Sequence, residues 1–409
     1  MGDRTEVEIR SITEEEVEDF MVAGARGFGI DRTLNEGDGD RFLSVNALEA
    51  TMIARDRGHI VATFGSYDLD LTVPGGESVT AAGTSHVTVH PTHRRQGILT
   101  EMMTRHLNQA IERGQPMAAL WSSEDRIYQR FGYGQACSGL AIDIPANTVT
   151  LPSGPDDVTV HPLTTDEAAK AFPSVYEEVR LLRPGLLRRS EDWWELRVFL
   201  DAEHWRNGFS RLRYVSAERS GQPVGYIAYR QRDLGMDEEG ITRIIEFIAV
   251  DDDVRRTLWH FITNIDLHRH VTWWNAPVDE PMLLEVDRFR SVKSHQVDTL
   301  WLRPLDVVRV LETRRYERDG SIVLGVDDPF LGRGGTFRLD VNSGIGTCRP
   351  SDEEPQVTMD ISVLGRLYLG GHSAHRLARA ALIQGSAEAV HTTDELFVTL
   401  SPPTCIEIF

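Results

Sequence analysis

The sequence has little of three things that define large classes of protein: cysteine, long apolar runs and excess positive charge. Its 409 residues include 3 cysteines, none in C-x-x-C spacing, so neither a disulfide framework nor a zinc ribbon is expected. No stretch approaches the roughly eighteen apolar residues of a membrane span. The first residues, MGDRTEVEIR, are charged where a signal peptide would be apolar. These absences predict a soluble, unprocessed protein of the reducing cytoplasm.

The charge of the chain is strongly acidic. Lysine and arginine together number 43 and aspartate and glutamate 63, which gives a formal net charge of −20. Nucleic acid is therefore not an expected partner, because binding it needs basic surface that neutralises phosphates. In one interpretation the acidity serves solubility. In the other it attracts cationic substrates, such as polyamines or amino sugars, into a cleft.

The length of the chain predicts more than one hydrophobic core. A chain of 409 residues corresponds to two or three domains of ordinary size. Prolines and a glycine within residues 145–155 mark one boundary, and a second falls near Pro304. We therefore expect domains at 1–150, 151–303 and 304–409.

The stretch from Val87 to Thr100, VTVHPTHRRQGILT, organises the first domain. Its first residues alternate as a strand, and Pro91 ends the hydrogen-bond ladder because it lacks a backbone donor. The residues that then recur at helical spacing are Leu99, Met102, Met103, His106, Leu107, Ala110 and Ile111. A helix start beside Gly97 presents free N–H groups and the positive end of the helix dipole. The pattern predicts an anion site, most naturally for a pyrophosphate, with a solvated basic turn as the alternative.

The rest of the first domain is expected to be a mixed sheet with helices. A strand at 7–9 leads to a helix, and residues 24–40, rich in glycine and acidic residues, are interpreted as a loop or broken helix near a site. Further strands are expected at 49–56, 59–73, 84–90 and 117–121. Residues 122–134 lead into a short helix that carries Ile127, Tyr128 and Phe131 and stops at Gly132.

A partial internal repeat predicts that the second domain is a degenerate copy of the first. Aligning residues 250–259 with 89–98 places the pair Arg255-Arg256 on Arg94-Arg95, but Leu258 stands where the glycine would be. Aspartates at 251–253 sit where an anion would approach, so the copy is expected to keep the fold and lose the cofactor site. Strands at 214–218, 225–230 and 241–250 and a helix to about residue 268 follow in the same order.

The third domain is predicted to begin with a helix around residues 305–311. Strands are expected at 321–326, 335–341 and 357–364, with helices at 362–370 and 374–383. The glycine-rich run 331–335 favours a hairpin turn over a phosphate loop. The chain closes with LSPPTCIEIF, whose prolines and alternating apolar residues favour an extended, docked end at Phe409.

Other groups of residues are interpreted as structural. His268 and His270 lack a cysteine or carboxylate at ligand spacing, so no metal is expected. The Trp273-Trp274 pair is assigned to the core, because no basic stripe accompanies it as in a stacking platform for nucleic acid. Cys137 has no histidine partner nearby and is interpreted as a small buried hydrophobe.

The run Arg94-Arg95-Gln96-Gly97-Ile98-Leu99 resembles the cofactor signature of the GCN5-related N-acetyltransferases (GNAT), Arg/Gln-x-x-Gly-x-Gly/Ala after a strand, with leucine in place of the final small residue. The longer string VTVHPTHRRQG, the later SEDRIYQRFGYG and an end on Phe are together similar to the Eis (enhanced intracellular survival) family of acetyltransferases. The resemblance covers the whole chain. It implies an α/β (α+β) fold of two tandem GNAT-like domains, the second degenerate, followed by a domain similar to the sterol carrier protein. It also implies a homohexamer, built as a dimer of trimers.

The resemblance implies that the strand edge and the basic turn hold acetyl-CoA, the acetyl donor. The residues carried over are Val87, Thr88, Val89, Arg94, Arg95, Gln96, Gly97, Ile98, Leu99, Thr100, Ser123 and Glu124. Backbone N–H groups of such a turn suit a pyrophosphate, arginine adds charge-assisted hydrogen bonds, and a free strand edge can pair with the pantetheine amides.

Two residues are expected to be catalytic. Tyr128 matches the family's general acid, which protonates the departing CoA thiolate, and a phenol with a reference pKa of about 10 still holds its proton at neutral pH. Phe409 matches the family's general base, the α-carboxylate of the last residue. The implied reaction is direct acetyl transfer to a primary amine through a tetrahedral intermediate, with no covalent enzyme intermediate. From the residues alone, Tyr128 is equally well a core aromatic and Phe409 a docked terminus.

The acceptors that the resemblance implies are aminoglycosides, other polyamines and some lysine side chains. The candidate substrate-binding residues are Asp31, Glu36, His86 and Trp121, of which the tryptophan is equally well a core residue. The competing interpretation is a non-catalytic protein that binds an apolar ligand in its third domain and keeps the first only for its fold. The intact Gly97 and Tyr128 favour the enzyme.

Overall fold

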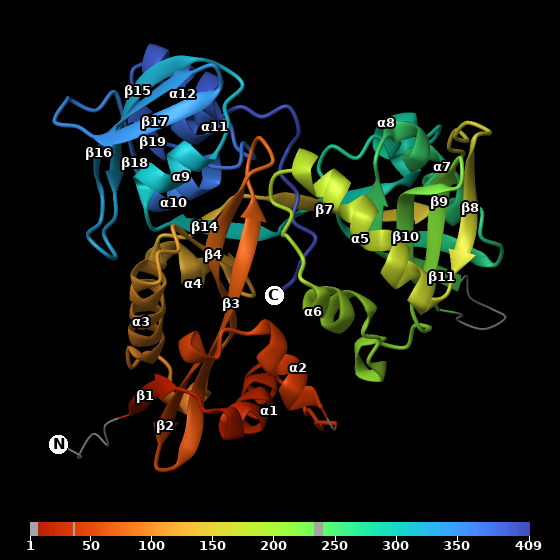
Figure 1. The fold of residues 1–409 in the computed structure, drawn as a ribbon, viewed down its shortest axis with the longest axis horizontal. Helices are drawn as coiled ribbons and strands as arrows, with labels where there is room; N and C mark the ends of the chain where they lie inside the picture. The colour runs from red at the N-terminus through yellow and green to blue at the C-terminus, as the bar shows by residue number, and fades with distance from the viewer. Residues whose placement is uncertain (1–6, 36, 233–239) are drawn as a thin grey trace. The chain divides into compact units, whose positions relative to one another are not determined.

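A computed structural model describes residues 7–35, 37–232 and 240–409 of the chain, which divides into two compact units (Figure 1). The first unit comprises Met1–Ala136, Leu300–Leu400 and Glu407–Phe409, and the second comprises Cys137–Thr299 and Ser401–Ile406. Within the described ranges, no helix is long and apolar enough to cross a membrane. In the same ranges, no group of three or more histidine, cysteine or acidic side chains is placed to hold a metal ion.

The first unit contains a 7-stranded sheet in the order β1-β2-β3-β4-β5-β14-β6. Its strands are β1 (Glu8–Ser11), β2 (Met52–Asp56), β3 (His59–Thr72), β4 (Ser78–Val89), β5 (Met117–Trp121), β6 (Gly134–Gln135) and β14 (Leu300–Pro304). All neighbours run antiparallel except β4 and β5, which pair in parallel. The expected strands are confirmed, with β4 beginning earlier than predicted.

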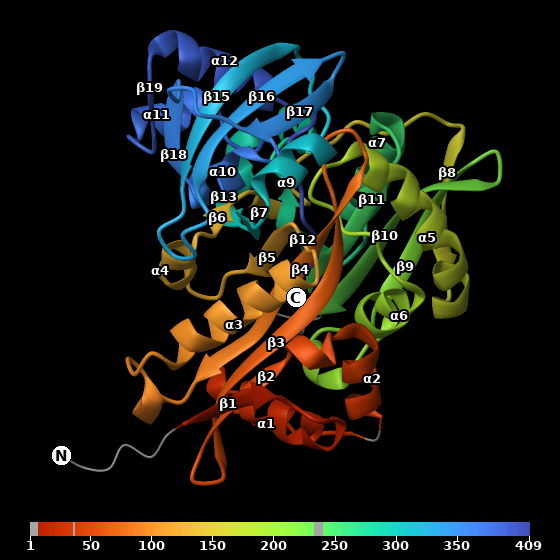
Figure 2. The ribbon, with the colours of Figure 1, turned by 60° about the vertical axis from the view of Figure 1, so that its left-hand side comes forward.

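Helices cover both faces of this sheet, and Figure 2 shows α3 lying along β3 and β4. These helices are α1 (Val17–Gly27), α2 (Asp38–Val45), α3 (Ile98–Glu112) and α4 (Asp125–Tyr128). Alternation along β2 assigns the faces, because Met52 and Ala54 pack in the cluster that includes α3 whereas Ile53 packs with Phe20 of α1. The segment 24–40 is indeed a broken helix: it is the end of α1, a connection and the start of α2.

The side chains expected on the inner face of α3 do face the core. Fully buried are Ile98, Met102, Met103, His106, Leu107 and Ala110. Leu99 and Ile111, at the two ends of the predicted pattern, are partly buried and pack against the same cluster. Helical spacing thus correctly predicted the buried face of α3. Ile98 is a core residue that it did not predict.

The sheet of the second unit repeats the first, with one strand exchanged. Its strands are β7 (Ser138–Pro145), β8 (Val158–Leu163), β9 (Arg213–Arg219), β10 (Gln222–Arg232), β11 (Gly240–Ala249), β12 (His268–Pro277) and β13 (Lys293–Asp298). Their order is β8-β9-β10-β11-β12-β7-β13, which matches β1-β2-β3-β4-β5-β14-β6 place for place. The last strand of each repeat, β7 or β14, therefore lies in the sheet of the other repeat. The domains expected at 1–150, 151–303 and 304–409 stay a prediction, because each of the two larger sheets contains a strand from the other repeat.

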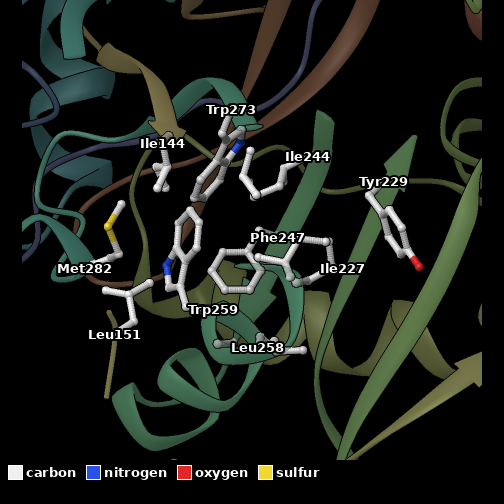
Figure 3. Packing of buried hydrophobic residues seen from close by; sticks show 14 of the residues in the cluster. Ile144, Leu151, Ile227, Tyr229, Ile244, Phe247, Leu258, Trp259, Trp273 and Met282 are labelled. Atoms are coloured by element: carbon white, nitrogen blue, oxygen red, sulfur yellow. The ribbon is translucent and has the colours of Figure 1, made fainter. Parts of the chain in front are cut away.

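The core of the second unit is built on aromatic side chains from three elements. Its helices are α5 (Thr165–Leu182), α6 (Glu191–Trp193), α7 (Asp252–Thr263) and α8 (Met282–Glu285). Phe247 of β11 meets Trp259 of α7 and Trp273 of β12 edge to face, with ring centroids 5.3 and 5.4 Å apart (Figure 3).

Two predictions for the second unit are wrong. Trp274 is not a core residue, since it is 36% exposed; it follows Trp273 on the same strand, and neighbours on a strand point to opposite faces. The helix predicted to reach residue 268 ends at Thr263.

The third part of the chain folds as a 5-stranded sheet, β17-β16-β15-β18-β19, within the first unit. Its strands are β15 (Gly320–Asp327), β16 (Gly335–Asn342), β17 (Ile345–Pro350), β18 (Val357–Asp360) and β19 (Ile383–Gly385), and its helices are α9 (Val307–Thr313), α10 (Ile361–Leu367), α11 (Ala374–Arg379) and α12 (Ala387–Phe397). The run 331–335 joins two antiparallel strands, which confirms the hairpin. The strand predicted at 357–364 is wrong beyond Asp360, where α10 begins, and α12 was not predicted.

Candidate active site

The chain between β4 and α3 forms a helix start without a side-chain cap. A single helical turn, Pro91–His93, leads from β4 to Gly97, which precedes α3. The first intrahelical bond runs from the N–H of Glu101 to the carbonyl of Gly97. The N–H groups of residues 98–100 therefore have no intrahelical acceptor and stand at the positive end of the helix dipole. This geometry suits an anion.

Backbone conformation, rather than space, explains the glycine at this turn. Gly97 has a φ of 87°, in the left-handed region that side chains disfavour. A Cβ built on it would meet no atom within 4 Å. Arg95 lies in the same region with a φ of 62°, a conformation that costs a non-glycine residue about 1 kcal/mol or more.

The first sheet opens just before this turn. β4 pairs with β5 from Ala81 to Thr84, and no pairing of these strands is found beyond that point in the described residues. His86 has a φ of 49°, and the register of β3 against β4 shifts between Thr63 and Gly65, so β4 carries a bulge there. The edge of β4 past Thr84 is consequently available to a ligand.

A cavity of about 840 Å³ lies along this free edge. It is lined by Gly27, Phe28, Val87, Thr88, Val89, His93, Arg94, Arg95, Gly97, Ile98, Leu99, Thr100, Ser123, Glu124, Ile127, Tyr128 and Arg130. Every residue expected to hold acetyl-CoA lines it except Gln96, whose amide donates to the carbonyl of Thr92 at 3.1 Å. The free edge of β4, the start of α3 and the segment after β5 thus line one continuous cavity.

Some residues that line the cavity were not predicted from the sequence. Ile127 and Arg130 are three residues apart on the helical turns that carry Tyr128, so helical spacing could have indicated them. Gly27 ends α1 against β4, where a Cβ would overlap the side chain of Thr88, and a glycine at a helix end gives no such signal in the sequence.

The phenol of Tyr128 is the buried proton-carrying group of this cavity. Only 4% of the residue is exposed. Burial raises the pKa of Tyr128 to about 12, against a smaller opposing effect from a hydrogen bond with the side chain of Ser123. The phenol is therefore fully protonated at neutral pH. Such a group can donate a proton but cannot serve as a base there.

Phe409 lies in the first unit and shares one aromatic neighbour, Tyr67, with His86. It is 7% exposed, and its ring meets Tyr67 of β3 edge to face at 6.2 Å. The ring of Tyr67 is 6.3 Å from His86, which also lies 6.0 Å from Phe20 and 5.8 Å from Phe42. Tyr67 therefore links the end of the chain to His86, which lies at the bulge of β4.

The candidate substrate-binding residues lie outside the cavity lining. His86 directly precedes Val87 on β4 and is partly buried beside Phe20, Phe42 and Tyr67. Trp121 is the last residue of β5 and pairs with Leu300 of β14. Asp31 is exposed in the connection between α1 and α2. Glu36 lies outside the described residues.

In the second repeat, the turn that corresponds to residues 91–97 is filled by hydrogen bonds of the protein's own side chains. The side chain of Asp251 accepts a hydrogen bond from the N–H of Val254 at 2.9 Å and so caps α7. Arg255 donates to Glu280 and Arg256 to Glu285, each at 2.6 Å. The helix start and both arginines are thereby satisfied within the second unit.

Family models match all three parts of the chain. Two models, each described as an acetyltransferase (GNAT) domain, match residues 8–136 and 185–310, and a sterol carrier protein domain matches residues 307–406. An N-acetyltransferase of Streptomyces avermitilis is 36% identical over 99% of both chains. The N-acetyltransferase Eis of Mycobacterium tuberculosis is 34% identical over 76% of both chains. The chain belongs to the Eis family of GNAT N-acetyltransferases.

Solved structures agree with this assignment. Eis1 from Mycobacterium abscessus superposes with a TM-score of 0.83 at 28% identity, covering 98% of this chain and 100% of the other. A GNAT protein from Anabaena variabilis has a TM-score of 0.84 at 21% identity, covering 99% and 100%, and shows the fold alone. The predicted architecture of two tandem GNAT domains and a domain like the sterol carrier protein is confirmed, as is the prediction of an acetyltransferase.

Proposed function

We propose that this Eis-family acetyltransferase moves an acetyl group from acetyl-CoA directly to a primary amine, with Tyr128 as general acid and the α-carboxylate of Phe409 as general base. One observation carries the proposal: a single cavity joins the uncapped start of α3, the free edge of β4 and the phenol of Tyr128. An anion site alone suits any nucleotide phosphate. A protonated phenol in the same cavity suits group transfer from a thioester.

The residues of the cavity fit acetyl-CoA, the donor that GNAT acetyltransferases use. Bound there, it supplies a thioester acetyl group and a thiolate leaving group. The N–H groups of residues 98–100 suit its pyrophosphate, and Arg94, Arg95 and Arg130 on the cavity wall add positive charge. The backbone of Val87–Val89 suits its pantetheine amides, because that strand edge is not paired with β5.

Tyr128 donates the proton that the departing sulfur needs. A free thiol has a reference pKa of about 8.5. The phenol, with its pKa raised to about 12, stays protonated until the sulfur develops charge beside it. A phenol with its ordinary pKa of about 10 is already protonated at neutral pH, and burial raises that pKa further.

Phe409 accepts the proton of the acceptor ammonium, directly or through water. A free α-carboxyl has a reference pKa of about 3.5, so it is ionised at neutral pH and can accept a proton. The buried position of Phe409 against Tyr67 supports this role. We place the acceptor beside His86, which shares its neighbour Tyr67 with Phe409, and keep Trp121 and Asp31 as further candidate contacts.

We propose cationic amines as acceptors, namely aminoglycosides and other polyamines, and lysine side chains as a further class. The formal net charge of −20 supports this choice, because an acidic protein concentrates cations at its surface. We also propose that the protein works in the cytoplasm as a homohexamer, a dimer of trimers, whose mass light scattering measures.

The test incubates the protein with acetyl-CoA, a thiol reporter and a panel of polyamines and aminoglycosides. CoA is expected to be released only when an amine is present. Tyr128→Phe is expected to lower kcat by about 100-fold or more while acetyl-CoA binding is kept, as for the loss of a general acid. No CoA release with any amine would overturn the proposal in favour of the binding protein.

A further inference from the structure

The hydroxyl of Thr84 joins three elements at the point where β4 and β5 part. Thr84 is the last residue of β4 that pairs with β5. Its Oγ1 lies 3.0 Å from Nε2 of His106 on α3 and 3.1 Å from the phenol oxygen of Tyr133, which follows the helical turns of Tyr128. All three side chains are at most 2% exposed. The first unit thus holds a small polar network inside an otherwise apolar cluster.

The protons of this network have one consistent arrangement. Burial lowers the pKa of His106 to about 3, so its imidazole is neutral. Nδ1 of His106 is buried without a hydrogen-bond partner, and an unfilled acceptor costs less than an unfilled N–H, so the proton sits on Nε2. His106 then donates to Thr84, Thr84 donates to Tyr133, and Tyr133 donates to the sulfur of Met103 at 3.8 Å. Each hydroxyl proton is used once.

The network also touches the segment that carries the proposed acid. The N–H of Tyr133 donates to the carbonyl of Tyr128 at 3.3 Å. The two tyrosine rings meet edge to face, with centroids 6.3 Å apart. Three walls of the cavity, namely β4, the helix α3 and the segment of Tyr128, are therefore tied to one hydroxyl group.

We propose that Thr84 is a positioning residue for acetyl transfer: its hydroxyl, bonded to His106 and Tyr133, holds the phenol of Tyr128 at its working distance from the free edge of β4. The inference rests on the proposed role of Tyr128. Apolar side chains of similar volume would fill the same space without the desolvation cost of three polar groups. The network therefore serves geometry at the opening of the sheet, where β-strand pairing no longer fixes the distance.

The first test is Thr84→Val, which keeps the volume and removes both hydrogen bonds. We expect kcat to fall by about 10- to 100-fold, since a displacement of about 1 Å costs that much, while the Kd of CoA changes by less than about 2-fold. Thr84→Ser restores the hydroxyl and most of the rate. The control is Thr51→Val, because Thr51 is equally buried in the same unit and its hydroxyl also makes two hydrogen bonds, to Ala47 and Ser66. Thr51→Val should lower the melting temperature similarly and leave kcat unchanged.

The second test separates positioning from plain stability by combining Thr84→Val with Tyr128→Phe. If Thr84 acts through Tyr128, the second substitution adds no further loss of kcat to the first. Equal losses in both backgrounds, or a loss confined to the KM of acetyl-CoA, would overturn the inference. If Thr84→Val does not fold, Tyr133→Phe replaces it in the same cycle. Full activity of Tyr128→Phe alone would instead contradict the proposed role of Tyr128 as general acid.

Discussion

The ring of Phe409 meets the ring of Tyr67 edge to face, with centroids 6.2 Å apart and planes at 80°. This contact joins the last residue of the chain to β3, an interior strand of the first sheet. A chain end held by its final side chain has its carboxylate one bond from a fixed Cα, so the position of the carboxylate depends on chain length.

Adding one glycine after Phe409 should therefore remove the base without disturbing the fold. The extension moves the terminal carboxylate by about 3.5 Å and replaces the original one by an amide, which cannot accept the proton. We expect kcat to fall by at least about 100-fold with CoA affinity kept. The control carries the extra glycine after Gly221 instead, in the turn between β9 and β10. Unchanged turnover of the extended chain would remove Phe409 from the mechanism.

Gly97→Ala should weaken acetyl-CoA binding through the backbone. An alanine at a φ of 87° carries about 1 kcal/mol of strain, and relaxing it turns the N–H groups of residues 98–100 away from their common direction. We expect the Kd of acetyl-CoA to rise by about 5- to 10-fold in calorimetry. Gly58→Ala is the matched control, since Gly58 has a φ of 81° and an equally open surrounding but lies between β2 and β3. Equal affinity losses in the two variants would contradict the role of the turn.

The buried His106 should make the protein less stable in acid. Its pKa is lowered from 6.5 to about 3 by burial, so between these values the unfolded chain binds a proton that the folded chain does not. Stability therefore falls as the pH drops through this window, by about 3 kcal/mol at pH 4.5. His106→Gln keeps a donor for Thr84 and does not titrate, so its urea midpoint should fall less between pH 6.5 and 4.5. Parallel curves for both proteins would refute the assignment.

Asp328→Ala should strongly destabilise the first unit. Arg303 of β14 donates to both carboxylate oxygens of Asp328 at 2.9 Å, and neither side chain is exposed by more than 2%. Removing the carboxylate leaves a buried guanidinium unpaired, which costs about 3–5 kcal/mol. Glu353→Ala, which breaks the exposed pair with Arg338, is the control and should cost less than about 1 kcal/mol. Urea unfolding of both variants measures the difference.

Local features of this chain were predictable because a few neighbouring residues decide them. Pro91 and Gly97 mark the end of β4 and the start of α3, and helical spacing identified the buried face of α3. The run 357–364 shows how two local signals compete: its alternation favours a strand throughout, but Asp360 accepts a hydrogen bond from the N–H of Ser362 at 2.8 Å and starts α10.

Other features depend on which partner a group chooses, and most of those partners are far away in the sequence. The side chain of Gln96 turns back to Thr92, a choice that residue type alone does not reveal. The free edge of β4 and the contact of Phe409 with Tyr67 arise from pairings between distant segments. Strand alternation does imply that Trp273 and Trp274 face opposite sides, so the assignment of both to the core disregarded a signal that was present.

The exchanged strands set an order in which the molecule can be completed during synthesis. β5 can pair with its neighbour β14 only after β14 has left the ribosome. That happens about 180 residues later, or about 10 to 35 s at ordinary elongation rates. Until then the nascent first sheet has an open strand edge, the kind that other chains can pair with. Production of the protein should therefore be sensitive to translation speed and to chaperones over that interval, and a fragment ending after the first GNAT match would carry the open edge permanently.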